Sequence, residues 1–100
     1  MQVYFTQCRG YGGDVFSYSI NHTLEGVKNF IIKDIKSLID FELKNPIRGE
    51  INTIEVKRLK GWLERVTNSP EPFDVVGDKW FSSCAEENCY YEISKEEVGE

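Results

Sequence analysis

The fold is decided in residues 15–27, VFSYSINHTLEGV, where one hydrophobic period replaces another. In its first half, large side chains occupy every second position: Phe16, Tyr18 and Ile20. That alternation is the period of a β-strand with one buried face. Thr23 then has the side chain of a helix N-cap, and Val27 begins a series of apolar residues spaced by three or four positions. The chain therefore passes from a strand directly into an amphipathic helix.

The residues before this stretch predict the first half of a hairpin. Residues 2–8 also alternate, with Val3 and Phe5 on one face, and the glycine-rich segment 9–14 follows them. Glycine tolerates the positive φ that tight links need, so two alternating runs around this segment indicate an antiparallel pair. We expect an N-terminal hairpin over residues 1–20.

Two helices are predicted in the middle of the chain. The first spans residues 23–43 and ends before Pro46, which disfavours helical backbone in the residue that precedes it. The second spans residues 52–67 and has the clearer start. Asn52 is a good N-cap and Glu55 stands three residues later, which is the spacing of a capping box.

The last part of the chain alternates again and predicts a second hairpin over residues 74–94, followed by a frayed tail over residues 95–100. In its first strand, simple alternation places Val76 and Trp80 on the same face. A hairpin cannot bury its apolar face alone, so we expect both hairpins to join one antiparallel sheet with the two helices packed on one face. The prediction is a single α+β domain, residues 1–100, in the order ββααββ.

Composition places the chain among compact globular proteins. A length of 100 residues with 40% hydrophobic residues suits one domain. No run of about 18 apolar residues is present, and the first residues lack the basic and apolar segments of a signal peptide. We therefore expect a cytoplasmic protein with no membrane contact.

The three cysteines, Cys8, Cys84 and Cys89, are an odd number, which argues against a secreted disulfide framework. The chain has one histidine, His22, and the cysteine spacing does not supply a four-ligand zinc site. We expect the cysteines to be small, half-buried apolar residues and expect no metal or cofactor. A disulfide between Cys84 and Cys89 is the alternative.

The net charge is concentrated at the C-terminal end. Residues 71–100 carry nine acids and two lysines, a balance of −7, whereas residues 1–70 carry eight acids and ten bases, a balance of +2. The two values sum to the −5 of the whole chain. Large aromatic residues lie among these acids, and an acidic surface with aromatic anchors suits contact with a basic partner.

The predicted binding site accordingly combines acids and aromatics of the second hairpin: Asp74, Asp78, Trp80, Glu86, Glu87, Tyr90, Tyr91 and Glu92. The anchors would be Trp80 and whichever of Tyr90 and Tyr91 faces away from the helices. The same pattern also fits an ordinary hairpin that packs one face on the helices and turns its acids to water. The sequence leaves both interpretations open.

No catalytic motif is present, so the sequence favours a non-enzymatic protein-binding module. We expect an inhibitor that occupies a basic, nucleic-acid-binding surface of a partner protein or complex, without binding nucleic acid directly. In kind, though not in any residue pattern, the chain resembles the small proteins that phages make against CRISPR and restriction systems. It is expected to be a monomer or a homodimer.

Three alternatives remain at this stage. One is a ligand-binding or enzymatic domain with a pocket between sheet and helices, for which the chain offers His22, Cys8 and tyrosines in no recognisable arrangement. Another is an oligomerising module that pairs by a sheet edge or by the apolar face of the first helix. The third is nucleic-acid binding by the basic side chains of the second helix, chiefly Lys57, Arg58 and Lys60.

Overall fold

A computed structural model of the chain describes residues 1–10, 12, 15–70, 73–83 and 89–99. It contains two helices and five strands, in the order β1 (Gln2–Gly10), β2 (Val15–Asn21), α1 (Leu24–Lys44), α2 (Thr53–Asn68), β3 (Asp74–Val76), β4 (Lys79–Ser83) and β5 (Cys89–Glu97). All strands pair antiparallel in a single sheet of order β2-β1-β5-β4-β3. The predicted α+β fold is confirmed.

Both helices begin at the residues that the capping signals indicate. The hydroxyl of Thr23 accepts a hydrogen bond of 3.0 Å from the backbone N–H of Gly26, and the side chain of Asn52 accepts one of 3.1 Å from Glu55. Such caps satisfy N–H groups that a helix start otherwise leaves without a partner. The helices therefore start at Leu24 and Thr53 because a polar cap precedes each of them.

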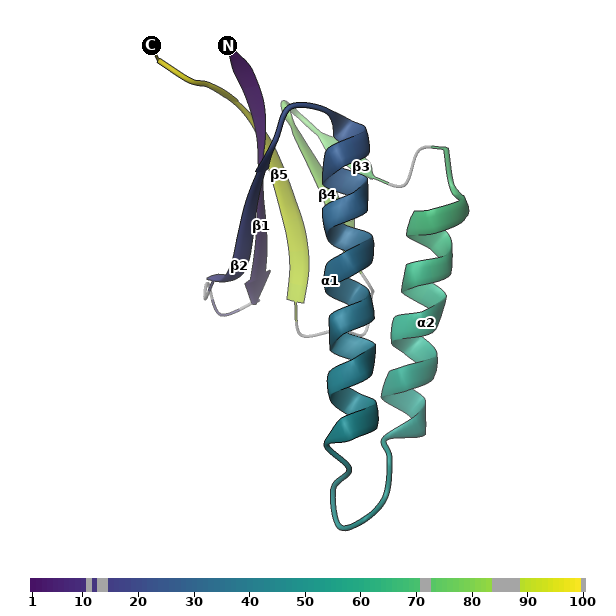
Figure 1. Ribbon diagram of the computed structural model, residues 1–100. Helices are drawn as coiled ribbons and strands as arrows, with labels where there is room; N and C mark the ends of the chain where they lie inside the picture. Colours follow the sequence, from purple (N-terminus) through teal and green to yellow (C-terminus); the bar gives the residue numbers. More distant parts are fainter. Residues whose placement is uncertain (11, 13–14, 71–72, 84–88, 100) are drawn as a thin grey trace.

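The two helices lie side by side on one face of the sheet (Figure 1). The core between them and the sheet is formed by buried side chains of both helices and of β5, among them Ile31, Ile35, Leu59, Trp62, Tyr91 and Ile93. The ring of Trp62 lies 5.4 Å from that of Tyr91, and the Trp62 side chain is wholly enclosed. Burial of this apolar stripe against the sheet supplies most of the stability of such helices.

The C-terminal hairpin differs from its prediction in one respect. Gly77, at a φ of 65°, and Asp78 form a two-residue turn that divides the expected first strand into β3 and β4. Glycine reaches this φ without strain, which suits the first position of such a hairpin turn. The turn changes the alternation, so that Trp80 pairs with Val75 and shares its face. The expectation that Trp80 shares a face with Val76 was wrong.

The end of the chain also differs. Strand β5 runs to Glu97, so residues 95–97, which we expected in a frayed tail, belong to the sheet. They pair with Gln2 to Tyr4 of β1, the longest strand pairing in the sheet. Beyond β5, the N–H of Val98 donates a hydrogen bond of 2.8 Å to the carbonyl of Met1. Pairing with the N-terminal strand is a long-range contact that alternation near the C-terminus cannot reveal.

Candidate functional site

The helices cover one face of the sheet and leave the other without a helix (Figure 1). Because side chains alternate along strands, residues next to the buried Tyr91 and Ile93 point to the uncovered side. Register extends this face across the sheet. We call it the open face, and its residues are Val3, Phe5, Gln7, Arg9, Val15, Phe16, Tyr18, Ile20, Asp74, Val76, Lys79, Phe81, Tyr90, Glu92, Ser94 and Glu96.

Large apolar side chains of the open face are exposed to an unusual degree. Along β2, Phe16 is 64% exposed, Tyr18 is 68% exposed and Ile20 is 60% exposed. The Tyr18 ring lies 6.1 Å from that of Phe5 on β1, and this pair marks one side of the face. Contiguous exposed apolar surface on a small domain indicates a site of association.

A second aromatic pair lies on the other side of the open face. The rings of Phe81 on β4 and Tyr90 on β5 are 6.4 Å apart at a tilted angle. Both side chains are half-buried, which suits rings held in place by their neighbours with an accessible edge. Preorganised aromatic rings of this kind are the usual anchors of protein interfaces.

Between the two aromatic pairs lies a cluster of three charges. The carboxylate of Glu92 accepts hydrogen bonds from Arg9 at 3.1 Å and from Lys79 at 3.0 Å. Burial acts to raise the pKa of Glu92, but the hydrogen bonds from Lys79 and Arg9 outweigh it, and the pKa lies below its ordinary value. The same hydrogen bond to Glu92 raises the pKa of Lys79. Glu92 is therefore ionised at neutral pH, and both cations already have an internal partner.

The charge of the open face as a whole is slightly negative. It carries two cations, Arg9 and Lys79, and three acids, Asp74, Glu92 and Glu96, a balance of −1. Asp74 and Glu96 are exposed, whereas Glu92 is enclosed by the two cations. The exposed charge of the open face is thus acidic.

The structure divides the residues of the predicted site between the two faces. Asp74, Tyr90 and Glu92 lie on the open face, whereas Trp80 and Tyr91 lie on the helix side. Asp78 is in the turn between β3 and β4, and Glu86 and Glu87 lie outside the described residues. Of the two tyrosines, Tyr90 is therefore the one that faces away from the helices.

Tyr91 is a core residue. It is fully buried, and its hydroxyl donates a hydrogen bond to the carboxylate of Asp34 on α1. Its ring also packs edge-on against Phe30. Tyr91 consequently holds α1 to the sheet and contributes no accessible surface.

Sequence reasoning did not include Phe16, Tyr18 and Ile20 among the site residues. Their alternation was visible, but alternation alone does not say which face of a strand the core covers. Ser17 and Ser19 occupy the helix side of β2, and Ser17 donates a hydrogen bond of 3.4 Å to Asp34. The large residues of this edge strand consequently point away from the core.

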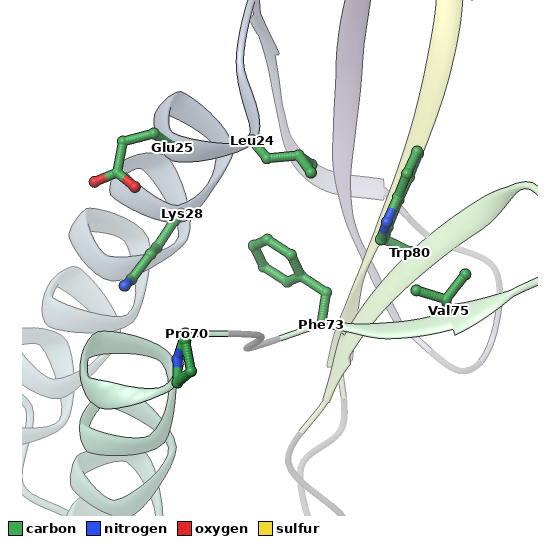
Figure 2. Close-up of a pocket in the computed structure, with 7 residues that line it drawn as sticks. All are labelled: Leu24, Glu25, Lys28, Pro70, Phe73, Val75 and Trp80. Atoms are coloured by element: carbon green, nitrogen blue, oxygen red, sulfur yellow. The ribbon is translucent and has the colours of Figure 1, made fainter.

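A cavity of about 360 Å³ lies on the helix side, beside the first turn of α1. Figure 2 shows the Phe73 ring extending toward α1, below Leu24, with Trp80 on the far side of the cavity and Glu25 turned away from them. Lys28 and Pro70 border it on the side of the helices, and Lys28 makes no ion pair with any described residue. Its volume is at the lower end of the range of small-molecule sites, and its lining combines apolar side chains with the charged Glu25 and Lys28.

No catalytic or metal arrangement emerges from the described residues. Cys8 is buried in the core, whereas His22 is exposed at the junction of β2 and α1. Within the described ranges, no group of three or more His, Cys, Asp or Glu side chains is placed to hold a metal ion. The alternative of a bridge between Cys84 and Cys89 falls outside the described side chains.

Comparison of the chain with protein-family models, curated proteins and solved structures found no match. In the part of the chain that is described, neither helix has the length and apolar character needed to cross a membrane. Its function is therefore inferred from the chemistry of its surfaces.

Proposed function

We propose that the chain is a non-enzymatic protein-binding module whose open face docks onto a basic surface of a partner protein. The observation that carries the proposal is the row of exposed apolar side chains on β2, continued across the sheet by two aromatic pairs. Burial of such rings on association releases water from apolar surface and supplies the anchors of an interface.

The charge of the same face supports a basic partner. Two acids of the open face are exposed: Asp74 on the edge strand β3 and Glu96 near the end of β5. The chain as a whole carries a net charge of −5. Complementary charge of this kind raises the rate of encounter more than the final affinity. Arg9 and Lys79, which would otherwise attract phosphate, are both paired with Glu92.

We further propose that the partner surface is one that binds nucleic acid, so that the chain acts as an inhibitor in the manner of phage proteins directed against CRISPR and restriction systems. This step rests on analogy in size, acidity and the absence of a catalytic motif from the sequence. A basic groove that evolved for phosphate is the kind of surface that an acidic, aromatic face fits.

The test is capture of partners from a bacterial lysate on the immobilised chain, after nuclease treatment to remove bridging nucleic acid. Tyr90→Ala should weaken capture of a specific partner about thirtyfold, because truncation of a central interface aromatic costs about 2 kcal/mol. Phe41→Ala is the matched control, since Phe41 is 61% exposed but lies on α1, away from the open face.

A second set of variants tests the charge. Asp74→Asn combined with Glu96→Gln should slow association with the captured partner and reduce its dependence on salt, with little change in the dissociation rate. Equal capture by Tyr90→Ala, Phe41→Ala and the unmodified chain would contradict the proposal. So would an association rate that does not change with salt.

The cavity supports a second candidate function, the binding of a small apolar anion. Leu24, Phe73 and Trp80 supply apolar surface to the cavity, and Lys28 at its border can pair with a negative group. The probe is 8-anilinonaphthalene-1-sulfonate, an aromatic sulfonate whose fluorescence rises in apolar sites. Leu24→Trp should fill the cavity and abolish the signal, and Lys28→Gln should weaken it. An unchanged signal in both variants would exclude the cavity as the site.

A further inference from the structure

We propose that β2 pairs with β2 of a second copy of the chain, antiparallel about a twofold axis at Tyr18, to form a continuous ten-stranded sheet. The proposal concerns the purified chain alone and does not depend on the partner described above. It rests on the edge position of β2, on its lack of charge and on the symmetry of its sequence.

The two edges of the sheet are built differently. At one edge, β3 has three residues and contains Asp74, and short length and charge are devices that prevent an edge from pairing. At the other edge, β2 has seven residues, Val15–Asn21, none of which is charged or a proline. A bulge in the β1–β2 pairing leaves Phe16 without a partner on β1, whereas Ser17 to Asn21 stay in unbroken register. An edge strand of this kind presents N–H and C=O groups ready to pair.

The sequence of β2 reads alike in both directions about its centre. Around Tyr18 the chain has Ser17 and Ser19, and beyond them Phe16 and Ile20. An antiparallel twofold pairing centred on Tyr18 therefore places serine against serine on the helix side. On the open face it places Tyr18 against Tyr18 of the second copy and Phe16 against Ile20. Aromatic and aliphatic cross-strand pairs of this kind stabilise a sheet.

Charge favours a second copy at this edge over a basic partner. Two copies of a chain with a net charge of −5 repel each other, so self-association is favoured where charge is locally absent. Of the described strands, β2 is the one without a charged residue. The hydrogen bond that Ser17 donates to Asp34 also links β2 to α1. The dimer would join the two open faces, with the exposed residues of both β2 strands at its centre.

Disulfide trapping tests the register directly. In a chain with Cys84→Ser and Cys89→Ser, Tyr18→Cys should form a covalent dimer on mild oxidation. Residues opposite each other across an antiparallel pair have Cα atoms about 4.5–5.5 Å apart, within the reach of a disulfide. Phe16→Cys is the matched control, as Phe16 and Tyr18 are 64% and 68% exposed. In the proposed register the two Phe16 positions are offset by four residues, about 13 Å, too far to bridge.

Association is measured separately by sedimentation of the unmodified chain over a range of concentrations. We expect a monomer–dimer equilibrium and about a tenfold weaker dimer for Tyr18→Glu, which brings two like charges together at the axis. Val76→Glu, at the other edge and 65% exposed, should leave the equilibrium unchanged. A chain that stays monomeric at all concentrations would overturn the proposal. So would equal cross-linking of the two cysteine variants.

Discussion

The indole nitrogen of Trp62 donates a hydrogen bond of 3.1 Å to the hydroxyl of Ser82, and both side chains are buried. The bond connects α2 to β4, between which β3 lies along the chain. A buried tryptophan usually needs such a partner, because an N–H without an acceptor in the core loses its hydration without compensation.

Ser82→Ala should therefore lower the free energy of unfolding by about 1–3 kcal/mol, since it leaves the indole N–H enclosed without its acceptor. Urea denaturation followed by tryptophan fluorescence measures the change. Ser37→Ala is the control, because its hydroxyl is exposed and bonds to the carbonyl of Lys33 within α1. A loss of equal size in both variants would show that the buried contact contributes nothing specific.

Thr6→Val should change the free energy of unfolding in the opposite direction from Ser82→Ala. The Thr6 hydroxyl is fully buried and has no hydrogen-bond partner among the described residues. Replacing it with a methyl group removes a desolvated polar atom, so we expect no loss and a gain of up to about 1 kcal/mol. Thr23→Val, which removes the cap of α1, should cost about 1 kcal/mol in the same assay. A marked loss for Thr6→Val would indicate that the hydroxyl has a structural role.

Glu92→Gln should lower the melting temperature by a few degrees at neutral pH and by less in acid. A carboxyl whose folded pKa lies below the ordinary 4.5 stabilises the fold above that pH and loses this contribution as the pH falls through the folded value. The difference between the two chains should accordingly shrink below about pH 4.5. The ion pair also requires a charged Lys79, whose pKa the hydrogen bond to Glu92 raises above the ordinary 10.5. The stabilisation by this pair is therefore lost again in alkali, as the pH rises through the folded pKa of Lys79.

Thermal melts of both chains across this range provide the measurement. Glu50→Gln is the comparison, because Glu50 is exposed, lies outside the helices and makes no ion pair with any described residue, so its replacement should have little effect at neutral pH. The melting temperatures of the unmodified chain and of Glu92→Gln should converge in acid. If they diverge instead, the charge cluster does not stabilise the fold in the way proposed.

The chain should not retard naked DNA or RNA in a mobility-shift assay at physiological salt. Its net charge is −5, and on α2 the side chain of Arg58 is paired with Glu55 at 2.9 Å. A shift that is lost in Lys57→Gln with Lys60→Gln would assign nucleic-acid binding to α2. A shift that is lost in Phe81→Ala with Tyr90→Ala would make the open face a stacking platform for bases.

The positions of both helices and of the first hairpin could be predicted from local signals. Thr23 and Asn52 act as caps, and the change of period after Asn21 marks the passage from β2 to α1. Caps and periods act within a few residues, so they are legible in a single sequence. Gly77 followed by Asp78 is a turn signal, and simple alternation through it places Trp80 on the face of Val76, whereas the turn places it on the face of Val75.

The residues of the candidate site depend on which face of each strand the helices cover, and local sequence does not determine that face. Tyr90 and Tyr91 are adjacent and chemically alike, and alternation requires them to face opposite ways without saying which faces the core. That choice follows from long-range pairing, in which Tyr91 lies against Cys8 of β1 and beneath Trp62 of α2. By itself, then, the sequence determined which segments are helices and strands. The tertiary structure decided which side of the sheet stays open, because burial on one face is settled only when distant elements pack together.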